Sequence, residues 1–176
     1  DGTGGSATEG TDFATVNNIN IFAGDTTGTT TFNPTDDSLY DAATNEAAVI
    51  AISGVSGGSA TELESQSVSV TLIESQSTPT VTLTSSASAA TEDGDNLTIT
   101  GTLSVATYAD VTVTLATSGT ATDDTDYTLS DTITISSGST SGAGIFNPSS
   151  DNLYDAATSE TVTIDISNIT LTKIVV

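Results

Sequence analysis

The sequence predicts an all-β protein built of antiparallel β-sandwiches, and three observations support this prediction. Short segments alternate Val, Ile or Leu with Thr or Ser, which places apolar side chains on one face of a strand and polar ones on the other. These segments recur about every 10 to 15 residues and are separated by Gly, Ser, Asp and Asn. No window has the spacing of apolar residues that is typical of a helix.

Six segments show the alternation clearly and are predicted to form strands. They cover residues 67–73, 80–84, 96–103, 110–115, 131–135 and 161–166. In each, one face is apolar and packs inward, while the Thr-rich face meets solvent, as in antiparallel sheets that are covered on one side. The competing interpretation, a disordered acidic tail, fails because a disordered chain does not keep β-branched residues in alternation along its length.

The charge balance restricts the partners of this protein. The chain has 176 residues, 23 carboxylates, one basic residue and a formal net charge of −22. Nucleic acids and anionic lipids are repelled, because proteins bind both through Lys and Arg at the phosphates. Dense carboxylates instead attract cations, and hard oxygen ligands select calcium or magnesium.

Missing residue types exclude several kinds of site. Without Cys there are no disulfides or thiolate metal sites, and without His the usual zinc sites and His-based catalysis are excluded. No nucleophile–base pair remains, and no pair of carboxylates is marked out for glycoside hydrolysis, so we expect the protein not to be an enzyme. No apolar run approaches the roughly 20 residues of a membrane span. Acidity, Thr richness and the lack of Cys favour an extracellular protein of salty water.

An internal repeat organises the chain. Residues 32–46 read FNPTDDSLYDAATNE, and residues 146–160 read FNPSSDNLYDAATSE, an offset of 114 positions. With that offset, residues 1–62 overlay residues 115–176 without a gap, and 25 of the 62 pairs are identical. The same local structure is therefore expected twice.

The repeat predicts two domains that are incomplete in different ways. Residues 1–78 hold the C-terminal part of one repeat, and residues 79–176 hold the N-terminal and middle parts of the next. The first copy lacks equivalents of the strands at 80–84, 96–103 and 110–115. The second copy lacks an equivalent of the strand at 67–73, unless residues 171–176 take its place.

The order of motifs in the second copy resembles that of the Calx-beta domain. Glu92 follows the first strand in ATEDGD, and then come GTATDDTDYT at 119–128, DNLYDAATSE at 151–160 and the strand TVTIDISN at 161–168. The resemblance covers nearly the whole chain and implies immunoglobulin-like antiparallel β-sandwich repeats. Calx-beta domains occur in sodium–calcium exchangers and, in tandem, in very large bacterial surface adhesins.

The resemblance also implies a calcium site at one end of each sandwich. In calcium-binding members, the ligands come from the Glu near the first strand, the Asp before the Tyr, the acidic turn and an acidic cluster after the last strand. The matching positions of the second copy are Glu92, Asp124, Asp126, Asp151, Asp155 and Glu160. Those of the first copy are Asp12, Asp37, Asp41 and Glu46, and its final cluster retains only Glu74. The alternative for each Asp is that it only caps the backbone of its own turn.

Two functional predictions follow from these features. The first is a calcium-binding repeat that serves as a rigid spacer of a bacterial surface adhesin, with ions neutralising carboxylates where domains meet. The second is a subunit of a self-assembling extracellular filament, in which neighbouring copies complete each other's sandwiches head to tail by donating strands. A carbohydrate- or ice-binding module is a less favoured third prediction, because Thr-rich outer faces are ordinary in sandwiches.

Overall fold

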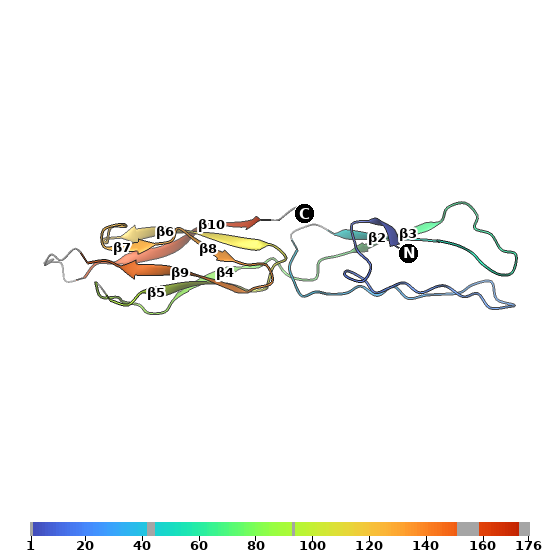
Figure 1. The fold of residues 1–176 in the computed structure, drawn as a ribbon, viewed down its shortest axis with the longest axis horizontal. Coiled ribbons are helices and arrows are strands. Elements are labelled where there is room, and N and C mark those ends of the chain that lie inside the picture. The colour runs from blue at the N-terminus through green and yellow to red at the C-terminus, as the bar shows by residue number, and fades with distance from the viewer. Residues whose placement is uncertain (1, 42–44, 93, 151–158, 173–176) are drawn as a thin grey trace. The chain divides into compact units, whose positions relative to one another are not determined.

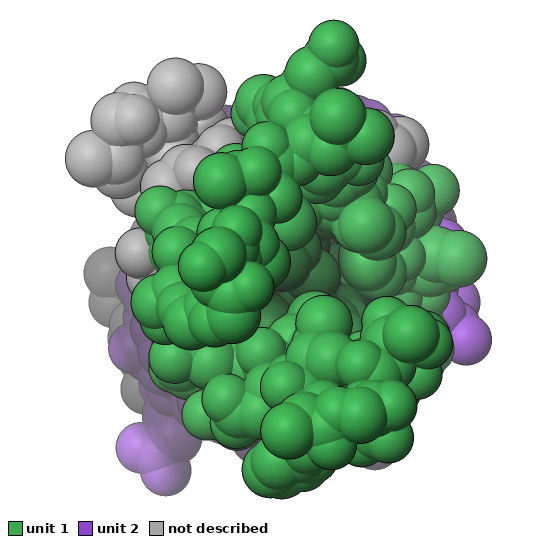
Figure 2. All heavy atoms as spheres, turned by 90° about the vertical axis from the view of Figure 1, so that its right-hand side faces the viewer, with its two compact units in different colours: residues 1–76 green, residues 77–176 purple. Residues whose placement is uncertain are grey.

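The chain divides into two compact units, residues 1–76 and residues 77–176, which are coloured separately in Figure 2. The computed structural model describes residues 2–41, 45–92, 94–150 and 159–172. The described residues form strands and no helix, so none of them belongs to an apolar helix of membrane-spanning length. The division lies two residues before the domain boundary predicted after residue 78.

Unit 2 consists of two antiparallel sheets (Figure 1). One sheet has the strand order β10-β6-β8, and the other has the order β4-β5-β9-β7. The strands are β4 (Val81–Ser85), β5 (Leu97–Leu103), β6 (Asp110–Gly119), β7 (Tyr127–Leu129), β8 (Thr132–Ile135), β9 (Ser141–Pro148) and β10 (Val162–Thr172).

Both sheets of unit 2 contribute to one hydrophobic core. Alternate residues of β6 are buried and face alternate residues of β8, with Val113 opposite Ile133 and Val111 opposite Ile135. The core residues are Ile99, Leu103, Val111, Val113, Leu115, Ile133 and Ile135. The side chains that alternate in the sequence are therefore buried on one face of each strand. Two antiparallel sheets around one core are consistent with a β-sandwich, as the all-β prediction requires.

β10 is longer than the sequence predicted. It pairs with β6 over nearly its whole length, with an irregularity between Ile166 and Asn168. Leu171 and Thr172 continue this same strand opposite Val111 and Asp110. These two residues therefore extend β10 and do not start a separate last strand, and residues 173–176 lie outside the described part of the chain.

Unit 1 has one three-stranded antiparallel sheet of order β1-β2-β3. Its strands are β1 (Gly2–Gly5), β2 (Glu46–Ala51) and β3 (Ser67–Leu72). Of the hydrophobic side chains described in this unit, only Phe13 and Ala48 are buried. Unit 1 therefore has far less core than unit 2.

The segment of unit 1 that aligns with β7, β8 and β9 is extended but forms no strand among its described residues. Figure 1 shows it as the long blue traces without arrows. In unit 2, β8 pairs with β6 and β9 pairs with β5. Among the residues described in unit 1 there is no equivalent of β5, and only the short β1 lies in the place where β6 ends, so the ladders that would define these strands are not formed.

Candidate functional site

The first predicted ligand of unit 1, Asp12, closes its own loop. Its carboxylate accepts a hydrogen bond from the backbone amide of Thr8 (N···Oδ2 2.5 Å). Its backbone amide donates to the Thr8 carbonyl, and its carbonyl accepts from the Thr35 amide, both at 2.9 Å. This loop is therefore fastened to the segment that leads into the acidic turn of unit 1.

The same hydrogen bonds occur 114 residues later around Asp126. The Asp126 carboxylate accepts from the Thr122 amide (2.6 Å), and the Asp126 carbonyl accepts from the Ser149 amide (2.9 Å). Asp124 has a φ of 63°, as its counterpart Gly10 has a φ of 87°. Asp is among the few side chains that adopt this left-handed conformation readily, which fits Asp124 to a turn.

Carboxylates in the acidic turn of unit 1 accept hydrogen bonds from nearby backbone amides. The Asp36 carboxylate accepts from the Ser38 amide (2.9 Å), and the Asp37 carboxylate accepts from the Leu39 amide (2.9 Å). The side-chain amide of Gln76 also donates to Asp36 (2.8 Å). The Ser38 amide, followed by the Gln76 side chain, holds the pKa of Asp36 below its usual value, because both donors favour the charged carboxylate.

Glu74 connects the end of β3 to the acidic turn. One of its carboxylate oxygens accepts from the Asp41 amide and the other from the Gln76 amide, each at 2.8 Å. Glu46, at the start of β2, pairs with Leu72 on β3. The structure therefore brings Asp37, Asp41, Glu46 and Glu74 to the end of unit 1 to which the Asp12 loop is also tied.

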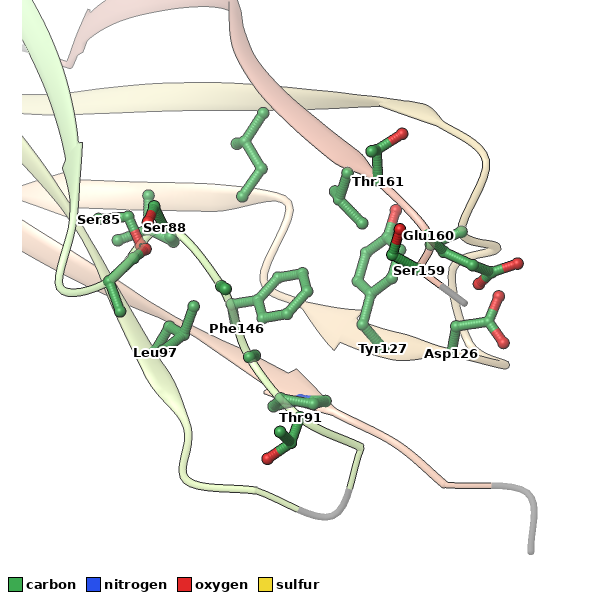
Figure 3. A pocket seen from close by; sticks show the side chains of 18 of the residues that line it. Ser85, Ser88, Thr91, Leu97, Asp126, Tyr127, Phe146, Ser159, Glu160 and Thr161 are labelled. Carbon is green, nitrogen blue, oxygen red and sulfur yellow. The ribbon is translucent and has the colours of Figure 1, made fainter. Parts of the chain in front are cut away.

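A cavity of about 870 Å³ lies at the corresponding end of unit 2 (Figure 3). Residues of both sheets line it. Its wall includes Leu83, Leu97, Ile99, Phe146, Val162 and Ile164 together with a Ser- and Ala-rich stretch at 85–90. The Tyr127 and Phe146 rings are stacked, with centroids 4.9 Å apart. The two sheets are thus less closely packed here than around β6 and β8.

Three predicted ligands of the second copy share this cavity. Glu92, Asp126 and Glu160 line it, and Figure 3 shows Asp126 and Glu160 at the same end, beyond the Tyr127 ring. Asp124 lies in the same loop as Asp126. Asp151 and Asp155 lie outside the described residues.

The candidate carboxylates that the structure describes thus lie toward one end of each unit but do not form a compact cage. Within the described ranges, no group of three or more acidic side chains is close enough to hold a metal ion. Several carboxylates instead accept backbone hydrogen bonds, the role that the alternative interpretation gave them. A carboxylate has about four acceptor positions, so such a bond leaves oxygen lone pairs that can also coordinate calcium.

Sequence reasoning missed the donors that orient these groups. Thr8 and Thr122 each stand four residues before a ligand candidate, and this shared spacing is the signal that identifies them. Gln76 was not among the candidates, although it donates both to Asp36 and to Glu74. Nothing local in the sequence marks the contact with Asp36, because the two residues are 40 positions apart.

No family model, curated protein or solved structure matches this chain. The Calx-beta resemblance therefore stays a prediction that rests on the motifs quoted above.

Proposed function

We propose that this chain is a non-catalytic extracellular structural protein, made of Calx-beta-like β-sandwich repeats that serve as a rigid spacer of a bacterial surface adhesin. The observation that carries the proposal is the recurrence of one carboxylate-closed loop at a spacing of 114 residues, once in each unit. Spacer proteins are built by repeating one structural module, and each module needs the same turns.

Calcium is the proposed cofactor of these repeats. The carboxylates that give the chain its net charge of −22 repel one another. The candidate ligands concentrate part of that negative charge at one end of each unit. A bound calcium ion would neutralise carboxylates there and draw the loops together, because its preferred six to eight oxygens come from several loops at once. Binding to the folded state alone would then stabilise the unit by mass action.

Thermal unfolding of the full chain, with calcium and with a chelator, tests the calcium proposal. At a calcium concentration 100 times the dissociation constant, we expect about 2.7 kcal/mol of added stability. For a unit of 100 residues this is a rise of roughly 10–20 °C in melting temperature. An unchanged melting temperature would remove calcium from the proposal.

Matched variants separate a specific site from general charge screening. Glu160→Gln and Glu92→Gln remove carboxylates that line the cavity of unit 2. Asp165→Asn removes an equal charge from an exposed position in the middle of β10. We expect the calcium-induced shift to fall in the first two variants and to persist in the third. Equal loss in all three would indicate screening alone, which magnesium at the same ionic strength would also reproduce.

A filament subunit is the second proposed function, because several strands lie at sheet edges. β10 and β8 end one sheet of unit 2, β4 and β7 end the other, and β1 and β3 end the sheet of unit 1. Edge strands pair readily with strands of neighbouring chains. Electron microscopy of the purified chain discriminates the two functions: fibres would support assembly, and a concentration-independent monomer on a sizing column would count against it.

A further inference from the structure

We propose that unit 1 presents the uncovered inner face of a sandwich, and that this face binds a three-stranded segment with the sequence pattern of β4, β5 and β6. The open face, as we define it, consists of Ile19, Ile21 and Ile52. This inference rests on the tandem-repeat part of the proposed function and does not depend on calcium.

The two units share local geometry around this face. The Phe13 and Phe32 rings of unit 1 are 5.0 Å apart, and their counterparts Tyr127 and Phe146 are 4.9 Å apart. Phe13 forms an antiparallel bridge with Pro34, as Tyr127 pairs with Pro148. The backbone of unit 1 therefore already has the course that β7, β8 and β9 follow in unit 2.

Close approaches of two equivalent glycines to the neighbouring backbone also show that the two units follow the same course. A Cβ atom on Gly28 would clash with the carbonyl oxygen of Asn20. A Cβ atom on the counterpart, Gly142, would clash with the carbonyl oxygen of Thr134, the counterpart of Asn20. The strand-like segments at 18–21 and 27–34 thus lie against each other as β8 lies against β9.

Equivalent side chains of the two units differ sharply in their exposure to solvent. Ile133 and Ile135 of β8 are both 0% exposed, whereas Ile19 and Ile21 are 55% and 59% exposed. Ile52 is 46% exposed, while its counterpart Ile166 packs against the core of unit 2. The sequence preserves Ile at all three positions, yet unit 1 leaves them in contact with water.

Unit 2 shows which strands cover the equivalent positions. In the β6–β8 ladder, Val113 stands opposite Ile133 and Val111 opposite Ile135. From the other sheet, the Cβ position of Gly101 on β5 is 3.7 Å from both isoleucines. β4 lies next to β5 and adds Leu83 to the same core. The covering elements are therefore β4, β5 and β6, and the described residues of unit 1 form no full counterpart of them.

The position of β1 indicates where the bound segment would end. Gly5 of β1 pairs with Ala48, just as Gly119 at the end of β6 pairs with Val162. Gly5 and Gly119 have φ values of 126° and 134°. β1 therefore occupies the place of the last residues of a β6-like strand, and the bound segment must arrive with its third strand in line with β1.

A second copy of this chain is a poor source of the segment. If it donated its own β4, β5 and β6, it would uncover its own Ile133 and Ile135. The exchange would bury one apolar face by exposing another, with no net gain. The occupant we assign is therefore a β4–β6 segment of this repeat type that is not already part of a closed unit.

A fusion tests this assignment in the presence of a chelator. A second copy of residues 77–114 is placed directly before residue 1, since residue 115 aligns with residue 1. We expect hydrogen exchange of the amides at 18–21 to slow by more than about tenfold relative to the unfused chain. A control fusion carries Thr in place of five core residues of the added copy: Leu83, Ile99, Leu103, Val111 and Val113. It should give no protection.

Equal exchange in the fusion, the control and the unfused chain would overturn the proposal. If the fusion is insoluble, the same segment is added as a separate peptide to the full chain, and the absence of protection there also overturns it. Protection of residues 18–21 that grows with the concentration of the unfused chain would show instead that a second copy covers the face. Since the chelator is present throughout, failure of this experiment is distinct from failure of the calcium melts.

Discussion

Replacing Ile133 with Ala should destabilise unit 2 strongly, whereas the same change at Ile19 should not. The two residues align in the repeat, and both are followed two positions later by another Ile. Ile133 is fully buried at the centre of the core, and Ile19 is more than half exposed. The pair therefore compares one sequence position in a covered and an uncovered setting.

The magnitude follows from what surrounds Ile133. Loss of three carbons costs about 2.4 kcal/mol of transfer free energy at ~0.8 kcal/mol each. The cavity adds about 1 kcal/mol, because the surrounding core relaxes only in part. The Cβ positions of Gly142 and Gly144 stand 3.1 and 3.3 Å from Ile133 side-chain atoms, so these glycines approach it closely. At Ile19 the transfer term is roughly halved and water fills the space, which leaves about 1 kcal/mol.

Native-state hydrogen exchange provides the assay, since it reads each unit separately. The amides of Val111 and Val113 report on opening of unit 2. A loss of ~3.5 kcal/mol should also lower the melting temperature of this 100-residue unit by roughly 15–25 °C. Ile133→Val is the milder variant, at about 1 kcal/mol, if the alanine variant does not fold.

The comparison has a clear refuting result. If Ile19→Ala destabilises its unit as much as Ile133→Ala does, residues 18–21 are covered in the isolated chain. The description of the open face would then be wrong.

Two further predictions concern the turns and the acidic end of unit 1. Gly119→Ala should destabilise unit 2 by more than ~1 kcal/mol in urea unfolding, because its φ is 134° and a Cβ atom would clash with the Thr161 carbonyl oxygen. The control variant Gly138→Ala, at a φ of 75° and with open space around its Cβ position, should lower the free energy of unfolding by less. Gln76→Ala should raise the pKa of Asp36 toward its usual value, as measured by NMR titration of the carboxyl carbon. Because this pKa is lowered by folding, its stabilising contribution is present above the ordinary pKa of aspartate and is lost as the pH falls through the folded value. An unchanged titration would show that the Ser38 amide alone sets it.

Strand positions were largely predictable from alternation, and the exceptions have physical causes. The predicted segments at 80–84, 96–103, 110–115 and 131–135 match β4, β5, β6 and β8 to within a few residues. β9 was not predicted, because glycines replace the inward residues where Ile133 approaches its backbone. The last half of β10 was missed because the irregularity between Ile166 and Asn168 breaks the period of two.

The candidate site was less predictable than the fold. The resemblance to the Calx-beta domain implied which carboxylates share an end of each unit, and the repeat matched them between the two copies. It did not indicate that Glu74 would accept the amide of Asp41, since that contact joins residues 33 positions apart. The exposure of Ile19 and Ile21 was equally hidden, because an alternating segment has the same sequence pattern whether or not a second sheet covers it.

The direction of β3 decides how a polypeptide passes through such a repeat. In unit 2, β4 begins and β10 ends at the end opposite the cavity, because Val81 pairs with Leu103 and Thr172 pairs with Asp110. β3 runs antiparallel to β2 and returns the chain of unit 1 to its acidic end, at Glu74. With such a return strand, the backbone enters at one end and leaves at the other, so a pulling force crosses the module lengthwise. Without it, the backbone would leave a module at the end where it entered. A force applied along a series of such modules would then bypass the body of each one.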